Sequence, residues 1–271
     1  MKKIEAGVVW PSLAPMAEAK GYKILAVWEN GFRNITTNTK PIVKPADLAG
    51  MKLRVPQGKW RVKMFQAYGA NPSPMAFSEV FVALQTGVMD GQENPLTQIY
   101  SAKFQEVQKF LSMTGHVYTP AYLVSGKNKF ASLPADVQAI LTQAARDTQA
   151  YVYTQAAKLD AELLDKIKAA GVKVNEADKD AFIAASKDVY ENFGKEVPEG
   201  GKLVKQAIEL GKGMCHSARP VSVVARVGCG HRRRAIDPLF TRTLARWQLF
   251  RSFSSVSSPR LSSSCWPAWR C

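Results

Sequence analysis

The first 212 residues of this 271-residue chain contain no cysteine and only four arginines. They also lack a glycine-rich phosphate loop and a paired-histidine metal motif. The acid/base candidates that remain are Glu79, Asp90 and Glu93, but their spacing is not that of a general acid and a general base. These absences argue against the common catalytic centres, and we expect a protein that is not an enzyme and needs no cofactor.

Long apolar runs are missing as well. No stretch approaches the roughly 18 apolar residues that cross a bilayer. The chain begins with two lysines after Met1, as secretory signals do, but Glu5, Pro11 and Pro15 interrupt the apolar stretch that should follow. As written, the chain is predicted to have no export signal and to remain in the cytoplasm.

The net charge of +15 is spread unevenly along the chain. Residues 1–212 hold 23 Lys and 4 Arg against 21 acidic residues, a net charge of +6. Residues 213–271 hold 10 Arg and no Lys against Asp237 alone, a net charge of +9, and they contain all four cysteines. Two different compositions therefore meet near residue 212.

The segment 213–271 is rich in serine and shows no sustained helical or strand period. These properties are typical of a gene translated out of frame, and we favour a tail unrelated to the fold, disordered or out of frame. One alternative is a basic arm that binds nucleic acid or anionic membrane. Another is a zinc site from Cys215, His216, Cys229 and His231, although their spacing does not match known zinc motifs. We expect neither a metal nor a nucleic-acid partner.

Apolar periodicity in the first 212 residues alternates between strands and helices. Strands are predicted at 23–28, 52–55, 107–113, 117–124 and 172–174, and helices at 57–68, 78–85, 135–170, 178–193 and 201–210. This alternation predicts an α/β fold with parallel strand pairing. The helix over 135–170 is unusually long and lacks a strict heptad, so we predict a brace across two lobes.

Arg54 lies within the short apolar strand predicted at 52–55. A guanidinium is rarely removed from water without an anionic partner, and its planar fork donates two parallel hydrogen bonds to a carboxylate. Three of the four arginines in this part of the chain (Arg33, Arg54 and Arg61) fall within 29 positions. Asn94 precedes a proline, which holds its backbone extended and leaves its amide free to donate. The pattern predicts a site for a small carboxylate.

Several motifs follow one another in a fixed order. They are Trp28-Glu29-Asn30-Gly31-Phe32-Arg33, Pro45-Ala46-Asp47-Leu48-Ala49-Gly50-Met51-Lys52-Leu53-Arg54-Val55, Gly69-Ala70-Asn71-Pro72, Ala83-Leu84-Gln85-Thr86-Gly87 and Asp90-Gly91-Gln92-Glu93-Asn94-Pro95. Over residues 15–212, their order and spacing closely resemble the substrate-binding proteins of tripartite ATP-independent periplasmic (TRAP) transporters, of the dicarboxylate-binding type.

The resemblance implies a periplasmic binding protein-like fold of two α/β lobes, joined by hinge strands and by a long helix that bridges the lobes. It implies a small organic acid held in the cleft by its carboxylate, membrane subunits of a TRAP transporter as partners, and a periplasmic location. We assign residues 1–31 and 120–159 to the first lobe with the hinge and bridging helix, and residues 32–119 and 160–212 to the second lobe. Part of the first lobe has no counterpart in this sequence, so we expect that lobe to be incomplete.

The resemblance also implies roles for individual residues. Arg54 matches an arginine that makes a two-pronged salt bridge with the ligand carboxylate, and Asn94 matches an asparagine that fixes the orientation of that carboxylate. Arg33 matches a second arginine that contacts the carboxylate. From the residues alone, Arg54 can also be an edge-strand arginine that reaches solvent, and Arg33 a turn residue.

Aromatic and acidic residues complete the predicted site. By the same resemblance, Phe77 forms an aromatic wall, and Trp28 and Glu79 lie in matching motifs without a defined role. The alternative for Phe77 and Trp28 is a place in the hydrophobic core. Arg61 is predicted to lie on the surface, and His116, which has no partner at metal-ligand spacing, is predicted to be structural.

Overall fold

The structure, a computed structural model, describes residues 2–212. By contacts the chain divides into two units, Met1–Arg219 and Pro220–Cys271, and the fold described here belongs to the first. The predictions made for the tail 213–271, including the zinc site, lie outside the described residues.

A six-stranded mixed sheet organises the described residues, with the strand order β3-β2-β4-β1-β5-β6. Its strands are β1 (Tyr22–Thr37), β2 (Lys52–Val55), β3 (Asn71–Pro74), β4 (Gly91–Asn94), β5 (Phe110–Gly126) and β6 (Lys173–Glu176). As predicted for the alternating region, β2 pairs in parallel with both β3 and β4. The long strand β1, in contrast, is antiparallel to both of its neighbours, β4 and β5.

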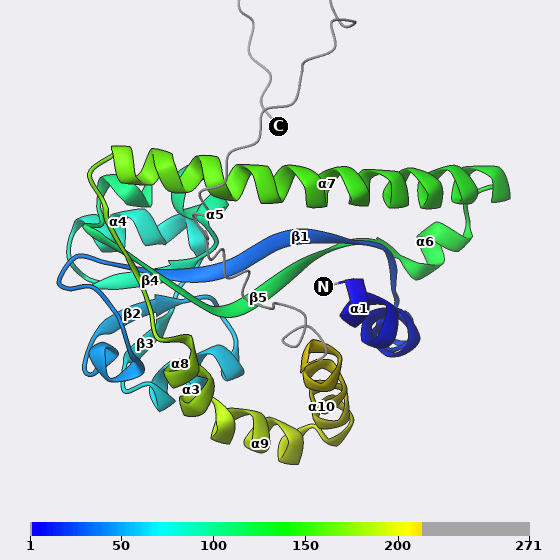
Figure 1. Cartoon of the computed structure of the whole chain (residues 1–271). Helices are drawn as coiled ribbons and strands as arrows, with labels where there is room; N and C mark the ends of the chain where they lie inside the picture. The colour runs from blue at the N-terminus through cyan, green and yellow to red at the C-terminus, as the bar shows by residue number, and fades with distance from the viewer. Residues whose placement is uncertain (1, 213–271) are drawn as a thin grey trace, which may run out of the picture. The chain divides into compact units, whose positions relative to one another are not determined.

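Helices cover both faces of the sheet (Figure 1). They are α1 (Lys2–Ile4), a π-helical segment (Glu5–Leu13), α2 (Ala14–Ala19), α3 (Lys59–Ala67), α4 (Val80–Gln85), α5 (Leu96–Ser101), α6 (Lys127–Ala131), α7 (Ala135–Ala169), α8 (Lys179–Ala185), α9 (Lys187–Glu196) and α10 (Pro198–Lys212), with 3-10 turns at Pro45–Leu48, Phe77–Glu79 and Phe104–Glu106. Helices α4, α5 and α7 lie on one face and α3 and α8 on the other. None of the helices within residues 2–212 combines the length and the apolar content needed to cross a membrane.

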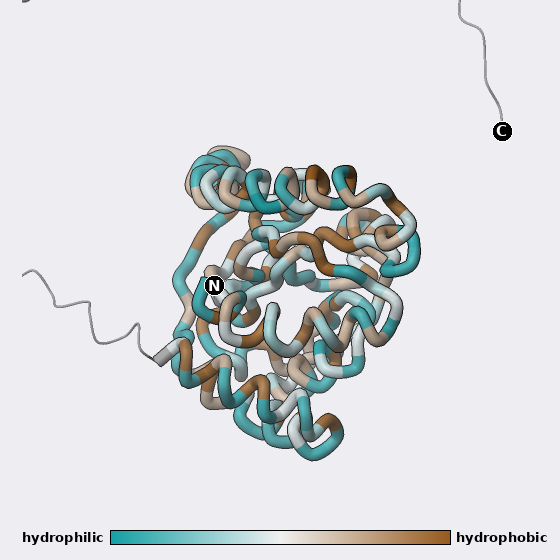
Figure 2. Tube along the Cα trace, turned by 90° about the vertical axis from the view of Figure 1, so that its right-hand side faces the viewer, coloured by the Kyte–Doolittle hydropathy of each residue, from teal (hydrophilic) through white to brown (hydrophobic). Residues whose placement is uncertain are grey.

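Two hydrophobic cores result, one on each face. On the face of α3 and α8, Leu53 and Ile35 of the sheet pack with Phe65 and Phe182. On the other face, Leu111 packs with apolar side chains of α4, α5 and α7. Figure 2 shows the same arrangement, with hydrophobic segments concentrated in the interior strands and hydrophilic turns on the outer helices. Burial of apolar area on both faces is the main stabilising contribution to this part of the molecule.

Two sequence predictions about the strands are wrong, and glycine explains both. The strand predicted at 23–28 does not end there, because Gly31 (φ +104°) sits at a register shift, and β1 continues through it to Thr37. The two strands predicted at 107–113 and 117–124 form the single strand β5, in which Gly115 (φ +53°) lies in a bulge opposite Asn34. Bulges let a strand bend without ending, and they accept glycine in conformations that other residues rarely adopt.

The outer parts of β1 and β5 form a two-stranded ribbon, because β4 pairs only with residues 34–37 of β1 and β6 only with residues 110–113 of β5. We call residues 22–32 of β1 with residues 118–126 of β5 the arm. The long helix predicted at 135–170 is confirmed as α7, and it runs along the arm and the sheet (Figure 1). Its Gln149 accepts a hydrogen bond from the backbone N–H of Val27 in the arm (3.1 Å).

Candidate ligand-binding site

Strand pairing brings the predicted site residues to one edge of the sheet. Arg54 of β2 lies beside Gln92 of β4, and Asn94 at the end of β4 lies beside Asn34 of β1. Since β2 and β4 are parallel, their carboxyl ends meet at the same edge, which is where open α/β sheets bind ligands. Residues from three separate segments of the sequence therefore converge there.

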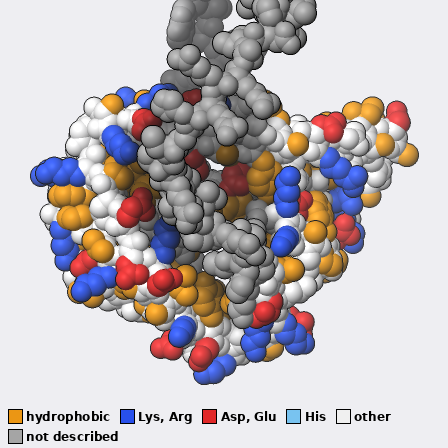
Figure 3. Space-filling view, viewed as in Figure 1, with side chains coloured by type: hydrophobic (Ala, Val, Ile, Leu, Met, Phe, Trp, Pro, Cys, Tyr) orange, Lys and Arg blue, Asp and Glu red, His pale blue; other side chains and the backbone are white. Residues whose placement is uncertain are grey.

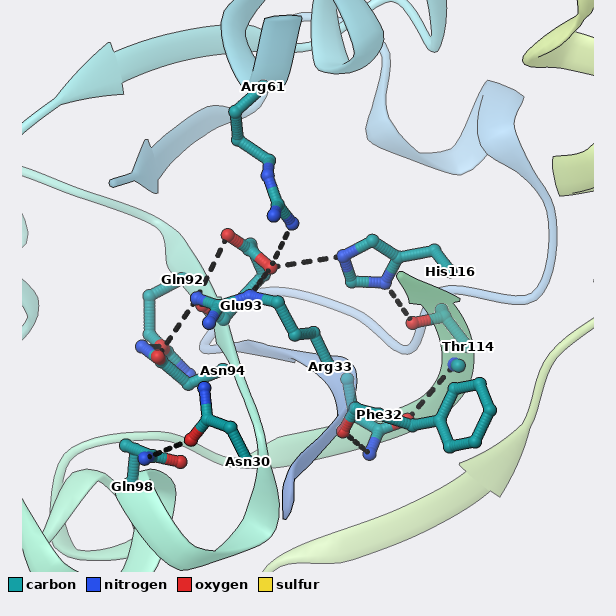
Figure 4. A network of polar contacts seen from close by, with 12 residues as sticks. Asn30, Phe32, Arg33, Arg61, Gln92, Glu93, Asn94, Gln98, Thr114 and His116 are labelled. Carbon is teal, nitrogen blue, oxygen red and sulfur yellow. Dashed lines mark hydrogen bonds and ion pairs between the residues drawn. The ribbon is translucent and has the colours of Figure 1, made fainter. Parts of the chain in front are cut away.

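A buried carboxylate, Glu93, organises one side of this edge (Figure 4). The Arg33 guanidinium donates from Nε to Oε2 of Glu93 (2.5 Å) and from Nη2 to Oε1 (3.1 Å). Arg61 on α3 donates from Nη1 to the same Oε2 (3.2 Å), and the Nε2 atom of His116 lies 3.1 Å from it. The Nδ1 atom of His116 lies 2.7 Å from the hydroxyl of Thr114. Three side chains thus point at one carboxylate from different directions.

The electrostatics of this network keep Glu93 ionised. Burial alone would raise the pKa of its carboxyl, but the hydrogen bond with His116 and the positive charges of Arg33 and Arg61 lower it to about 2. Burial lowers the pKa of His116 below its ordinary value, opposed by Glu93 and assisted by the two arginines, so the imidazole stays neutral. One negative charge therefore lies among two permanent positive ones.

Arg54 lies on the face of the sheet opposite to Glu93. Its neighbours Leu53 and Val55 point into the core beneath α3, and successive side chains of a strand point to opposite faces. The residue is 3% exposed. Its Nε and Nη2 atoms both donate to the backbone carbonyl of Met75 (3.1 and 2.6 Å), and within residues 2–212 it forms no ion pair. Burial lowers the pKa of its guanidinium, with the Glu93 charge acting against that shift. Arg54 is thus a buried cation without a carboxylate partner.

Asn94 connects the two sides of the edge. Its Oδ1 atom accepts a hydrogen bond from Nη2 of Arg33 (2.9 Å), and its Nδ2 atom donates to Oε1 of Gln92 (2.6 Å). Gln92 in turn donates to the hydroxyl of Thr36 (2.9 Å). All of these side chains are buried. Each amide is therefore fixed by partners on both sides, which favours a rigid and preorganised site.

The other predicted site residues are placed less closely together. Phe77 begins the 3-10 turn after β3, two residues beyond the Met75 carbonyl that Arg54 contacts, and it is 45% exposed. Its ring meets the edge of Phe104 at 5.7 Å, so it borders the core without being buried in it. Trp28 lies on the arm, where its indole Nε1 is buried without a hydrogen-bond partner. Glu79 is exposed, and among the described residues its side chain forms no hydrogen bond or ion pair.

Three residues of the network were not predicted as site residues. The prediction that Arg61 lies on the surface is wrong: only 18% of its side chain is exposed, because the first turns of α3 direct it at Glu93. The position of Glu93 between Gln92 and Asn94 was the available signal, since one carboxylate flanked by amides in an apolar context needs cationic partners. The side chain of His116 is fully buried against Phe65 (5.3 Å between ring centroids), which fits the structural role predicted for it.

The described residues show neither a metal cluster nor, on the face seen in Figure 3, a surface of one charge. Within residues 2–212, no group of three or more His, Cys, Asp and Glu side chains is placed to hold a metal ion. On the face seen in Figure 3, basic and acidic side chains alternate around hydrophobic ones, without a continuous surface of one sign. The arginine-lined edge of the sheet is therefore the strongest candidate for a functional site.

An α/β sheet with buried Arg54 on a parallel strand and buried Arg33 on a neighbouring part of the sheet, both near the carboxyl ends of β2 and β4, is the architecture of a ligand-binding α/β lobe. The family model described as "Bacterial extracellular solute-binding protein, family 7" (DctP) matches residues 1–196. The chain belongs to this family, whose named relatives include periplasmic binding proteins.

Individual relatives agree with this assignment. The chain is 40% identical over 206 residues to the 2,3-diketo-L-gulonate-binding periplasmic protein of Escherichia coli K12, covering 75% of this chain and 63% of that protein. Among solved structures, a TRAP periplasmic solute-binding protein from Roseobacter denitrificans with bound β-D-glucuronate is 35% identical, with a TM-score of 0.73 over 76% of this chain and 68% of its own. A second protein from that species, with bound L-galactonate, is 39% identical, with a TM-score of 0.69 over 75% of this chain and 69% of its own.

These structures confirm the predicted fold class, a two-lobed α/β binding protein. The chain spans 63%, 57% and 53% of the length of three of the curated relatives it matches. The lobe boundaries predicted from the sequence remain predictions.

Proposed function

We propose that this chain captures a small organic acid by its carboxylate and presents it to the membrane subunits of a TRAP transporter on the periplasmic side of the membrane. It binds and releases the acid without chemical change. Arg54 forms the two-pronged salt bridge with the carboxylate, and Asn94 and Arg33 orient it. Phe77 borders the bound acid, with Trp28 and Glu79 at the margin of the site.

The observation that supports this proposal most strongly is that Arg54 is buried without a carboxylate partner among the described residues. A buried guanidinium without a counter-ion is costly, since desolvation of a charge is offset only by good ionic and hydrogen-bond partners. Its Nε and Nη2 atoms share one backbone carbonyl. Its Nη1 atom donates no hydrogen bond within residues 2–212 and is not among the fully buried unpaired atoms, so it is open to a ligand. A carboxylate offers the oxygen geometry that this free side of the fork requires.

The surrounding charges support an anionic ligand for a second reason. Arg33 and Arg61 share the single charge of Glu93, so the edge of the sheet retains an excess of positive charge even before Arg54 is counted. A cluster of cations in a partly desolvated site attracts anions and weakens binding of neutral analogues. Solved relatives with bound glucuronate, galactonate and erythronate have ligands of this charge class.

The test is binding of acids to the whole chain and to matched arginine variants. Isothermal titration with D-glucuronate, L-galactonate and succinate should show binding of at least one acid and a rise in melting temperature, because a ligand stabilises the state it binds. Arg54→Gln should weaken that binding by about 100-fold or more, the usual cost of removing one partner of a buried charge pair. Arg146→Gln, which removes an exposed arginine from α7, should leave the affinity unchanged.

Two outcomes would contradict the proposal. Undiminished affinity in Arg54→Gln would show that another group holds the carboxylate. Equal binding of an acid and of its uncharged amide would show that the site does not select for the carboxylate at all.

A further inference from the structure

We infer that Arg61 is a specificity-determining residue, which contacts the part of the ligand distal to Arg54 and favours acids with a second anionic group. The inference rests on the proposed function, because it concerns the same site. No role for Arg61 follows from the motifs that identify the other site residues, and sequence considerations placed it on the surface.

The position of Arg61 in the fold supports a role at the ligand edge. Helix α3 begins four residues after β2 ends, so Arg61 follows the same strand whose third residue is Arg54. Arg54 lies on one face of the sheet and Arg61, with Glu93, on the other. Both stand at the carboxyl ends of β2 and β4, and an acid bound across this edge lies between them.

The hydrogen bonding of Arg61 leaves it available to a ligand. The Oε2 atom of Glu93 already accepts from Arg33 at 2.5 Å and lies 3.1 Å from His116, and Arg61 is the most distant of the three at 3.2 Å. Arg61 uses one of its donors in this contact, whereas Arg33 uses donors on two nitrogens for the Glu93 side chain and backbone and for Asn94. A guanidinium has five N–H donors, so most of those of Arg61 remain free.

Exposure distinguishes Arg61 from its partners. Its side chain is 18% exposed, compared with 7% for Arg33 and 0% for Glu93 and His116. Its Nε and Nη2 atoms have no hydrogen-bond partner among the described residues and are not among the buried polar atoms that lack one. Arg61 is therefore more exposed than Arg33, Glu93 and His116, and its free donors reach solvent.

Charge counting indicates what the free donors select. Arg33, Arg54 and Arg61 contribute three positive charges and Glu93 one negative charge, so the site has an excess of two. One ligand carboxylate neutralises only half of that excess. A second carboxylate near Arg61 neutralises the rest, and because the Arg61 side chain is only 18% exposed, that interaction is stronger than it would be in water. Binding energy is thus available to a dianion that a monoanion of the same shape cannot obtain.

The experiment compares two acids that differ only in the distal group. D-Glucarate and D-gluconate share their hydroxyl groups and differ in the second carboxylate, and succinate and butyrate form a shorter pair. Affinities are measured by titration for the whole chain and for its Arg61→Gln, Arg61→Lys and Arg146→Gln variants. We expect the unaltered chain to prefer the diacid by about tenfold or more, as expected for a charged contact that the monoacid lacks.

The variants separate specificity from a structural role. Arg61→Gln should abolish the preference by weakening the diacid while the monoacid affinity changes by less than about threefold, Arg61→Lys should retain part of it, and Arg146→Gln all of it. Equal weakening of both acids in Arg61→Gln would overturn the inference, since Arg61 would then act only through Glu93. An unchanged preference would overturn it as well. If no acid of either pair binds the unaltered chain, the proposed function itself fails for these acids, and the role of Arg61 fails with it.

Discussion

The two halves of the β1/β5 pair have the same backbone pairing and very different surroundings. In the lobe half, residues 33–37 of β1 are all buried. In the arm, Tyr22 is 58% exposed and Val124 49%, although both belong to the same two strands. The difference is the number of neighbours: β4 and β6 flank only the lobe half, and helices cover both of its faces.

The comparison shows why the candidate site lies in the lobe half. Glu93, Arg33 and His116 can hold fixed positions only where the surrounding structure is complete, because a buried polar network needs every partner in place. The arm, covered mainly by α7, has no comparable network of charges among the described residues. Trp28, the predicted site residue on the arm, has a buried indole N–H without an acceptor. We therefore expect substitutions in the lobe half to cost far more than the same substitutions in the arm.

The largest effect is expected from removing the charge of a glutamate. Glu93→Gln leaves Arg33 and Arg61 without their shared counter-ion and should reduce the free energy of unfolding by about 3–5 kcal/mol. Glu29→Gln in the arm, where the partly buried carboxylate accepts one hydrogen bond from Tyr118 (2.8 Å), should cost about 1 kcal/mol or less. Urea unfolding measures both, and similar losses for the two variants would contradict the comparison.

A second pair of substitutions compares apolar packing along one strand. Ile35→Ala opens a cavity in the core beneath α3 and should cost about 2–5 kcal/mol. Ile24→Ala in the arm removes a side chain that is only partly buried, so its cost should be about 1 kcal/mol. The two variants differ only in position along β1. Equal shifts of the urea midpoint, at unchanged slope, would show that the arm is as well packed as the lobe.

Much of the fold was predictable because local patterns determine it. The strand at 52–55 and the long helix α7 were predicted nearly to the residue, since an apolar run and a stretch without helix breakers are local signals. The continuity of β1 and β5 was not predictable. Gly31 and Gly115 serve equally well in a turn or in a bulge, and only pairing with a distant strand decides between them.

The site was predictable in part, and for a similar reason. Arg54 and Asn94 stand in recognisable motifs, and both lie near the carboxyl ends of β2 and β4. The ion pair of Arg33 with Glu93 could not be predicted, because the two residues are 60 positions apart and no local pattern specifies the pair. Arg61 was placed on the surface for the same reason, since a single arginine on a short helix gives no indication of a buried carboxylate on a strand.

The two halves should also respond to pH in opposite directions. The pKa of His116 is lowered by burial, so below its ordinary value near 6.5 the unfolded chain binds a proton that the folded chain does not, and stability falls as the pH falls. In the arm, burial and Glu29 raise the pKa of Tyr118, so stability falls as the pH rises above about 10.

Thermal unfolding between pH 5 and 8 measures the loss of stability that His116 causes as the pH falls. This loss should be smaller than the loss caused by Ile35→Ala. His116→Gln should flatten the slope in this range, and Tyr118→Phe should leave it unchanged. Glu93 contributes only at lower pH, because its pKa of about 2 lies below its ordinary value of 4.5 and its stabilisation is lost between the two. A slope that survives in His116→Gln would assign the acid sensitivity to other groups.

The smallest effect is expected on the uncovered face of the arm. Val124→Thr keeps the β-branched shape that strands favour and places a hydroxyl in water, so the free energy of unfolding should change by less than about 0.5 kcal/mol. Val27→Thr, on the paired strand but fully buried, should cost about 1–3 kcal/mol, because its hydroxyl leaves water. The two valines sit in one ribbon and differ in burial. If Val124→Thr proves as costly as Val27→Thr, then the face of the arm that carries Val124 is covered in solution, and the contrast between arm and lobe is smaller than the described residues indicate.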